Sequence, residues 1–381
     1  MRGSSRSRTG TPAAAVTAAA ADHAGGSQSA ITDVSYRNYE GELHLRPYFR
    51  WWTVTVATIR ANVNRKKLGY WVPAALILVI YFFMGILHYL TQNVRDQMSM
   101  TGAGMMGGML GLEAPVNQYA VTFYQSLSAT LFLLFIAALT IGSGSIAADN
   151  RANALLVYFA RPITRFDYLF GKWMGIFLLL AALTVVPALL MYAFFAVTYY
   201  DVGFLSENPW LILRLLAATL IPAALQASLV LGFSAWSKAP RLAAAVYAGF
   251  YFLLGNLTVQ GGRMMLASES ARARPQTVAV VSNMAVDGVA SGMALHLLDV
   301  TPRQVATSFE GREPGRRNRP PRNAEERARR ERREQRFQER LDRTTTERPD
   351  LAAMLLIGGA MILLPLAAAH AKVRAVEVIR G

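Results

Sequence analysis

The sequence predicts an all-α polytopic membrane protein with six transmembrane helices. An interfacial helix is expected before the first span, and a short cytoplasmic helix after the second. Several apolar runs exceed twenty residues without an acidic side chain, and 53% of the 381 residues are hydrophobic. A bilayer core about 30 Å thick needs roughly twenty apolar residues per helix, whereas soluble cores rarely need such runs.

The chain begins with a basic and then alanine-rich segment, which lacks the leucine-rich core of a signal peptide. We predict that residues 1–40 form a disordered tail. Residues 41–260 are expected to form the transmembrane domain. Residues 261–350 would be an extracytoplasmic loop with an Arg/Glu-rich insertion at 301–350, and residues 351–381 the sixth span and a cytoplasmic tail.

Residues 46–64 show helical periodicity ahead of the first span. One predicted face carries Tyr48, Trp52, Thr55, Ile59 and Val63, and another carries Arg46, Arg50, Arg60 and Asn64. Aromatic and basic side chains suit a helix that lies in the lipid headgroup layer. The alternative is an ordinary soluble helix packed on its own domain, but no soluble domain is long enough to receive it.

The six spans are expected at 69–90, 121–147, 173–199, 211–236, 241–260 and 351–371. Pro187 and Pro222 fall inside the third and fourth spans, where neighbouring helices can satisfy the freed carbonyl groups. The fifth span is short and contains Gly249, Gly255 and Asn256. We therefore expect the fifth span to be broken or re-entrant.

Lysine and arginine are distributed asymmetrically between the two sides of this arrangement. Among the short connections they concentrate before the first span, in the second-to-third and fourth-to-fifth connections and in the tail, while the loops 91–120 and 200–210 hold only Arg95. The long outer segment 261–350 is also rich in arginine, but long loops translocate largely regardless of their charge. The positive-inside rule then places both termini in the cytoplasm, which predicts a plasma (inner) membrane protein. A seventh span at 277–299 would move the tail outside and bring Asp287 into the bilayer, so six spans are preferred.

Several classes of chemistry are excluded by composition. Cysteine is absent, which excludes disulfides, iron–sulfur clusters, thiolate zinc sites and cysteine nucleophiles. The predicted span cores hold no Asp or Glu, and the five histidines are scattered. This argues against a proton- or sodium-coupled carrier and against intramembrane acid–base catalysis. We predict no catalytic, cofactor-binding or metal-binding residue in this chain.

Two unusual segments can be interpreted either as binding sites or as segments with no binding function. The segment 98–109, MSMTGAGMMGGM, holds thioethers that could bind Cu(I), but without histidine or cysteine nearby a flexible apolar outer loop is preferred. The Arg/Glu run at 324–342 could bind nucleic acid or an acidic partner. Its charges form i,i+4 pairs of opposite sign, which favours a solvated helix or disordered insert without nucleic acid.

The most patterned polar stretch is the second-to-third connection, DNRANALLVYFARPITRFDYLFGKW at 149–173. Asp149 or Asn150 can cap a helix that starts as the second span leaves the membrane. That helix must end near Arg161, because the residue before Pro162 avoids the α region. Its apolar side chains face the cytosol and indicate a docking site for a partner, or else a reversal loop folded against the span ends.

A second helix is predicted directly after the proline turn. Thr164 and Asp167 have the spacing of a capping box at its start. The helix would run into the third span, with Lys172 at the membrane interface. Gly171 and Gly175 form a GxxxG motif, which is typical of close helix–helix approach or of local flexibility.

The stretch IAADNRANALLVYFARPITRFDYLFGKWMG resembles the membrane subunit of type 2 ABC transporters, the permease family. Its members show an acidic residue after the second span, a short helix, and then a pattern like L-x-x-x-x-x-R-P-I-x-R-x-x-Y-x-x-G-K. Those places are held by Asp149, Leu155, Arg161, Pro162, Arg165, Tyr168, Gly171 and Lys172. Asn153 stands where a glycine is frequent, so we expect the start of the connector to be shaped differently.

The resemblance implies that this loop carries a coupling helix that seats in a groove of a separate ABC ATPase subunit. Two ATPases, which bind the ATP and magnesium, would switch two permeases between inward-open and outward-open states. The second permease would be another copy of this chain or a related chain. The sequence has no GxxxxGK[ST] phosphate loop, so the ATPase must be another polypeptide. The expected function is ATP-driven transport, with export as its direction.

Two other functions fit parts of the same sequence. A non-transporting membrane anchor or mechanotransmission subunit would still bind an ATPase but would lack a polar translocation path. A polytopic membrane enzyme would need clustered acids or histidines at a membrane face, and the sequence shows none.

Overall fold

The computed structural model describes residues 50–63, 68–98, 118–154, 163–266, 275–309, 332 and 347–373. The chain divides into a unit of residues 1–46, none of which is described, and a unit of residues 47–381, to which everything below refers. The predicted tail, most of the methionine-rich segment and nearly all of the Arg/Glu run lie outside the described residues.

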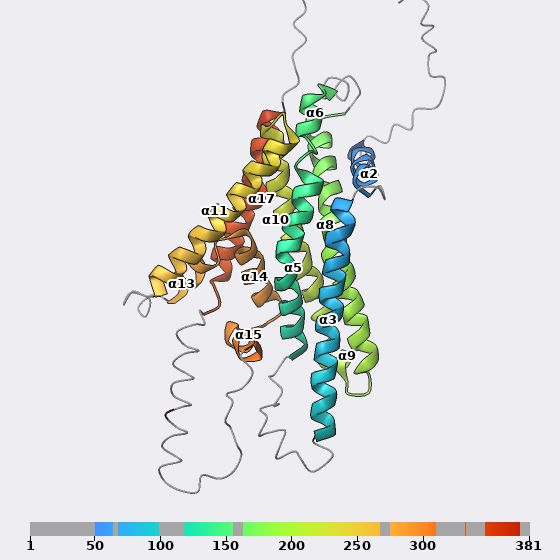
Figure 1. The fold of residues 1–381 in the computed structure, drawn as a ribbon, viewed down its shortest axis with the longest axis vertical. Coiled ribbons are helices and arrows are strands. Elements are labelled where there is room, and N and C mark those ends of the chain that lie inside the picture. The colour runs from blue at the N-terminus through green and yellow to red at the C-terminus, as the bar shows by residue number, and fades with distance from the viewer. Residues whose placement is uncertain are drawn as a thin grey trace, which may run out of the picture. The chain divides into compact units, whose positions relative to one another are not determined.

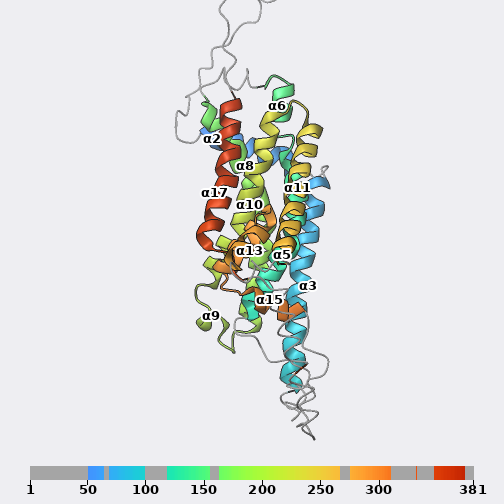
Figure 2. The same ribbon diagram turned by 90° about the vertical axis from the view of Figure 1, so that its left-hand side faces the viewer.

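The part of the chain that the structure describes is helical and contains no strand. Six of its helices are long and apolar enough to cross a membrane: α3 (Leu68–Met98), α5 (Gln118–Gly142), α8 (Arg165–Thr198), α10 (Leu211–Trp236), α11 (Pro240–Leu266) and α17 (Leu351–Lys372). The predicted all-α fold with six spans is confirmed. Figures 1 and 2 show these helices as one bundle.

Helix α10 is the centre of the bundle. It packs against α5, α8, α11 and α17, while α3 covers α5 and α8. Most of its side chains are buried, including polar Gln226 and Ser228. Its approach to α17 depends on Gly232, because a Cβ there would lie 2.5 Å from the Cβ of Pro365.

The fifth span is one uninterrupted helix, α11, so the prediction of a broken or re-entrant span was wrong. Within a bilayer every backbone group must find its partner inside the helix, which favours continuity. The interior glycines cost about 1 kcal/mol each relative to alanine, which is too little to break the helix. No neighbouring atom lies within 4 Å of a Cβ at Gly249 or Gly255, so neither glycine serves a close contact.

Short helices packed against the bundle follow the fifth span. Residues 261–350 were predicted as an outer loop, and the structure shows three short helices there: α13 (Pro275–Ser282), α14 (Val286–Leu297) and α15 (Pro302–Phe309). Helix α13 packs on α11, and α14 packs against α10, α17 and α5 (Figure 1). We call α13 and α14 the re-entrant pair, because neither is long enough to cross a bilayer.

Candidate functional site

The structure describes five of the eight residues predicted for the coupling loop: Asp149, Arg165, Tyr168, Gly171 and Lys172. Leu155, Arg161 and Pro162 lie outside the described residues, as does the body of the predicted coupling helix. The site is therefore defined by the two helix ends from which this connector starts and to which it returns.

The connector starts from α6 (Ala147–Arg151), which follows a turn after α5. Asp149 and Asn150, which were predicted to cap the following coupling helix, lie within α6, whose own N-cap position is Ile146 and makes no side-chain cap. The backbone amides of Ile146 and Ala147 instead donate to the hydroxyl oxygen of Ser234 on α10, both at 3.0 Å. A neighbouring span therefore supplies the cap of α6. The body of the predicted coupling helix lies outside the described residues, so its cap stays a prediction.

Ser234 and Asn150 together tie α6 to the end of α10. The Ser234 hydroxyl donates to the carbonyl oxygen of Ser143 at 2.8 Å. The Asn150 amide donates to the carbonyl oxygens of Ala235 at 3.2 Å and Ser237 at 3.3 Å. These contacts join residues more than eighty positions apart, so no local pattern in the sequence could have found them.

Asn153, at the end of α6, has a positive φ of 51°. This is the left-handed region, which glycine adopts freely and asparagine tolerates best among other residues. Asparagine at a place where a glycine is frequent therefore still permits this backbone. The presence of Asn153 where a glycine is frequent therefore does not require the connector to start with a different backbone shape.

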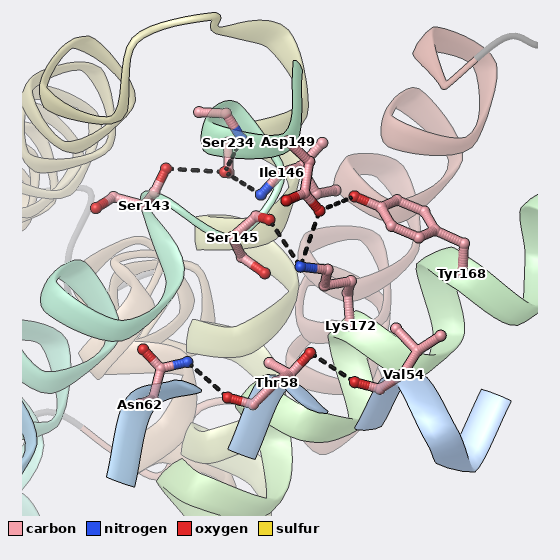
Figure 3. Close-up of polar contacts among 11 residues, drawn as sticks. Val54, Thr58, Asn62, Ser143, Ser145, Ile146, Asp149, Tyr168, Lys172 and Ser234 are labelled. Atoms are coloured by element: carbon pink, nitrogen blue, oxygen red, sulfur yellow. Dashed lines mark hydrogen bonds and ion pairs between the residues drawn. The ribbon is translucent and has the colours of Figure 1, made fainter. Parts of the chain in front are cut away.

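Asp149, Tyr168 and Lys172 meet at the other side of α6, and we call them the Asp149 cluster (Figure 3). The Lys172 ammonium nitrogen lies 2.9 Å from a carboxylate oxygen of Asp149. It also donates to the carbonyl oxygen of Ser145 at 3.1 Å. The Tyr168 hydroxyl donates to the same Asp149 oxygen at 2.7 Å.

Little water reaches this cluster. The Lys172 and Asp149 side chains keep 12% and 19% of their accessible surface, and Tyr168 is fully buried. A charge-assisted pair in such surroundings contributes about 1.5–3 kcal/mol, more than an exposed surface pair would. The cluster therefore fastens the start of the connector to its return, since Asp149 precedes the connector and Tyr168 and Lys172 follow it.

Helix α8 begins where the capping box predicted. Thr164 is the N-cap, its hydroxyl oxygen accepts from the Asp167 amide at 3.1 Å, and the Thr164 amide donates to the Asp167 carboxylate at 3.1 Å. This cap fixes the direction of α8, so that the Tyr168 and Lys172 side chains, one turn apart, both face α6. Arg165 lies on the first turn of α8, is exposed, and is not part of the Asp149 cluster.

The GxxxG motif brings α2 (Arg50–Val63) into close contact with α8. A Cβ at Gly171 would lie 2.6 Å from the Trp51 carbonyl oxygen, and one at Gly175 would lie 2.8 Å from the Thr58 Cβ. The Thr55 hydroxyl also donates to the Gly171 carbonyl oxygen at 3.1 Å. Of the two interpretations of this motif, close helix approach is therefore the correct one.

The face that α2 buries differs from the predicted stripe. Val54, Thr55 and Thr58 are buried against α8, while Trp52, which was predicted on the apolar face, remains 46% exposed. Small or branched side chains fit the groove over the two glycines, and an indole does not. The interfacial role of this helix stays a prediction.

The connector is thus bounded by a junction of four helices. The Asp149 cluster joins α6 to α8, Ser234 and Asn150 join α6 to α10, and the two glycines join α8 to α2. This geometry can transmit a displacement of the connector to several helices at once. A comparison with models of protein families matches the ABC-2 family transporter protein over residues 54–371, a range that contains the junction except the first residues of α2. A comparison with curated proteins gives no match.

Proposed function

This chain belongs to the ABC-2 family of transporter proteins, and from that premise we propose that its 149–172 connector couples a separate ATPase to substrate export. Membership makes the chain a multi-pass membrane permease subunit of an ABC transporter and not itself an enzyme. The proposal adds what the connector does, in which direction the substrate moves, and what assembles around the chain.

The observation that carries the proposal is the Asp149 cluster. It fastens both ends of the connector to each other at the base of α8, next to the contacts that hold α10 and α2. A displacement of a loop whose ends are not held together would be absorbed by the loop itself. Where the ends are joined to helices, the same displacement is transmitted to those helices. Coupling requires such a differential contact, since full bias of a two-state equilibrium takes roughly 5 kcal/mol.

The assembly we propose contains two permease chains and two ATPase subunits in the plasma membrane. ATP and magnesium would be bound by the ATPases. Six spans place the start of α3 and the end of α17 on the same side, and the basic residues favour the cytoplasm for both. The connector then also faces the cytoplasm, where an ATPase can reach it.

The coupling test replaces Lys172 by methionine, which keeps the length of the side chain but removes its charge. We expect ATPase to co-purify as before, while substrate-stimulated hydrolysis and uptake into inside-out vesicles both fall severalfold. The double exchange Asp149→Lys with Lys172→Asp restores the pair in reverse and should recover part of the loss. Lys238→Met is the matched control, because Lys238 is an exposed cation on the neighbouring loop.

Three results would separate the alternatives. Unchanged coupling in Lys172→Met would remove the connector from the mechanism. ATPase binding with no transport of any substrate would favour a mechanotransmission subunit. Uptake into right-side-out vesicles that hold ATP inside, with none into inside-out vesicles, would reverse the proposed direction.

A further inference from the structure

A partly buried carboxylate lies between α11 and the re-entrant pair, although no span that the structure describes carries one in its core. Asp287 is in the first turn of α14, in the re-entrant pair. The Tyr251 hydroxyl on α11 donates to one of its carboxylate oxygens. The other oxygen, Oδ1, is buried and has no hydrogen-bond partner, not even an amide of its own helix.

Tyr251 lies near the middle of the apolar stretch Pro240–Met265 of α11, which is long enough to cross a membrane. It lies roughly 16 Å along α11 from Pro240, at 1.5 Å per residue. That is about half of a bilayer core of about 30 Å. Asp287, which accepts the Tyr251 hydrogen bond, therefore lies level with the middle of this span.

No lysine, arginine or histidine that the structure describes forms an ion pair with Asp287. The nearby Tyr247 hydroxyl, one turn before Tyr251, is already used, since it donates to the Gln226 side-chain oxygen. An ionised carboxylate in such a place costs several kcal/mol unless a cation compensates it. Ionisable groups at this depth are therefore functional candidates.

The surroundings favour an organic cation over a metal ion. Metal ions of the calcium or magnesium type need about six oxygen ligands, and nowhere in the described residues do three His, Cys, Asp or Glu side chains gather. The side chains around the Tyr251 partner of Asp287 are instead aromatic. Phe135 stacks on Tyr251 with ring centres 3.8 Å apart, and Phe252 lies 5.5 Å from Tyr251.

Two exposed aromatic side chains lie beside Phe135. Phe132 on α5 and Phe252 on α11 contact each other and are 48% and 56% exposed. Aromatic faces attract desolvated cations and accept apolar groups. We propose that Asp287 recognises the positive charge of the transported substrate, and that this substrate is a hydrophobic organic cation. This inference rests on the proposed transport function.

The test measures binding of tetraphenylphosphonium to the purified full-length chain in phosphatidylcholine nanodiscs, with empty nanodiscs as the blank. Tetraphenylborate has nearly the same shape and the opposite charge. With each probe measured in a separate sample, we expect saturable binding of the cation and no saturable binding of the borate. Asp287→Asn should weaken this binding by at least about tenfold, as expected when one partner of a buried charge pair is removed.

Asp201→Asn is the matched control, because Asp201 is exposed in the turn after α8 and the substitution is the same. Its affinity for the cation should equal that of the unmodified chain. Equal affinity in Asp287→Asn would overturn the proposal and leave a protonated carboxyl with a structural role. Should Asp287→Asn fail to fold, the unmodified chain still decides, since equal binding of the two probes, or no saturable binding, would also overturn it.

The measurement needs no ATPase, so its outcome is separate from that of the coupling test. If the cation is not recognised but coupling is intact, the proposed transport function stands and only the proposed substrate class is rejected. If the cation binds but Lys172→Met has no effect on coupling, the Asp287 site stands and the proposed role of the connector is rejected.

Discussion

At the scale of single residues, the ion pair between Asp149 and Lys172 is the contact on which the connector depends. Both side chains are mostly buried, and the same carboxylate oxygen also accepts from Tyr168. Removing one partner leaves the other charge in surroundings that water hardly reaches, which costs more than the pair itself contributes. The three members are therefore expected to behave as a unit.

We predict that Tyr168→Phe weakens this unit without breaking it. The substitution keeps the buried ring and removes one hydrogen bond to a charged acceptor, which is worth about 1.5–3 kcal/mol. The apparent melting temperature in detergent should fall by a few degrees. Tyr200→Phe provides the control, since Tyr200 is exposed at the far end of α8. Equal shifts in the two variants would contradict the assigned role of the hydroxyl.

Asn153 offers a test of backbone conformation alone. Its φ of 51° is open to glycine and strained for a β-branched side chain. Asn153→Gly should leave stability and ATPase binding nearly unchanged, while Asn153→Val should cost about 1–3 kcal/mol. Thermal unfolding of both variants checks this, and an equally stable Asn153→Val would show that the left-handed turn is not required.

At the scale of elements, the packing of α2 on α8 decides where the N-terminal helix sits. We predict that Gly171→Leu separates the two helices, because even a Cβ would lie 2.6 Å from the Trp51 carbonyl oxygen and overpacking costs about 1–3 kcal/mol. Coupling should fall together with the melting temperature. Gly249→Leu is the matched control, since no atom lies within 4 Å of its Cβ. Comparable losses in both variants would mean that leucine itself, and not the α2 contact, is responsible.

The elements also show what sequence reasoning could reach. The capping box at Thr164 was predicted correctly because both partners lie within one helical turn. Ser234 was missed because it caps a helix almost ninety residues away, and a serine near a span end is unremarkable by itself. The re-entrant pair was missed because helices of eight and twelve residues are too short to appear as spans. Asp287 was therefore counted with an outer loop.

At the scale of the whole molecule, the side that each loop faces is directly testable, because the sequence contains no cysteine. Three single-cysteine variants cover the alternatives: Asp201→Cys, Lys238→Cys and Glu347→Cys. Asp201 follows α8, Lys238 follows α10, and Glu347 lies just before α17. All three residues are exposed, so a membrane-impermeant maleimide reagent can reach each from its own side.

With six spans and cytoplasmic termini, we predict that intact cells label Asp201→Cys and Glu347→Cys, and that Lys238→Cys reacts only after permeabilisation. The reason is that α13 and α14 are each too short to cross a bilayer, so we expect the segments before and after them to lie on one side. Protection of Glu347→Cys in intact cells would mean that the region of α13 and α14 crosses the membrane as a seventh span. Inversion of all three results would place the connector outside the cell, where no ATP-driven partner could act on the Asp149 cluster.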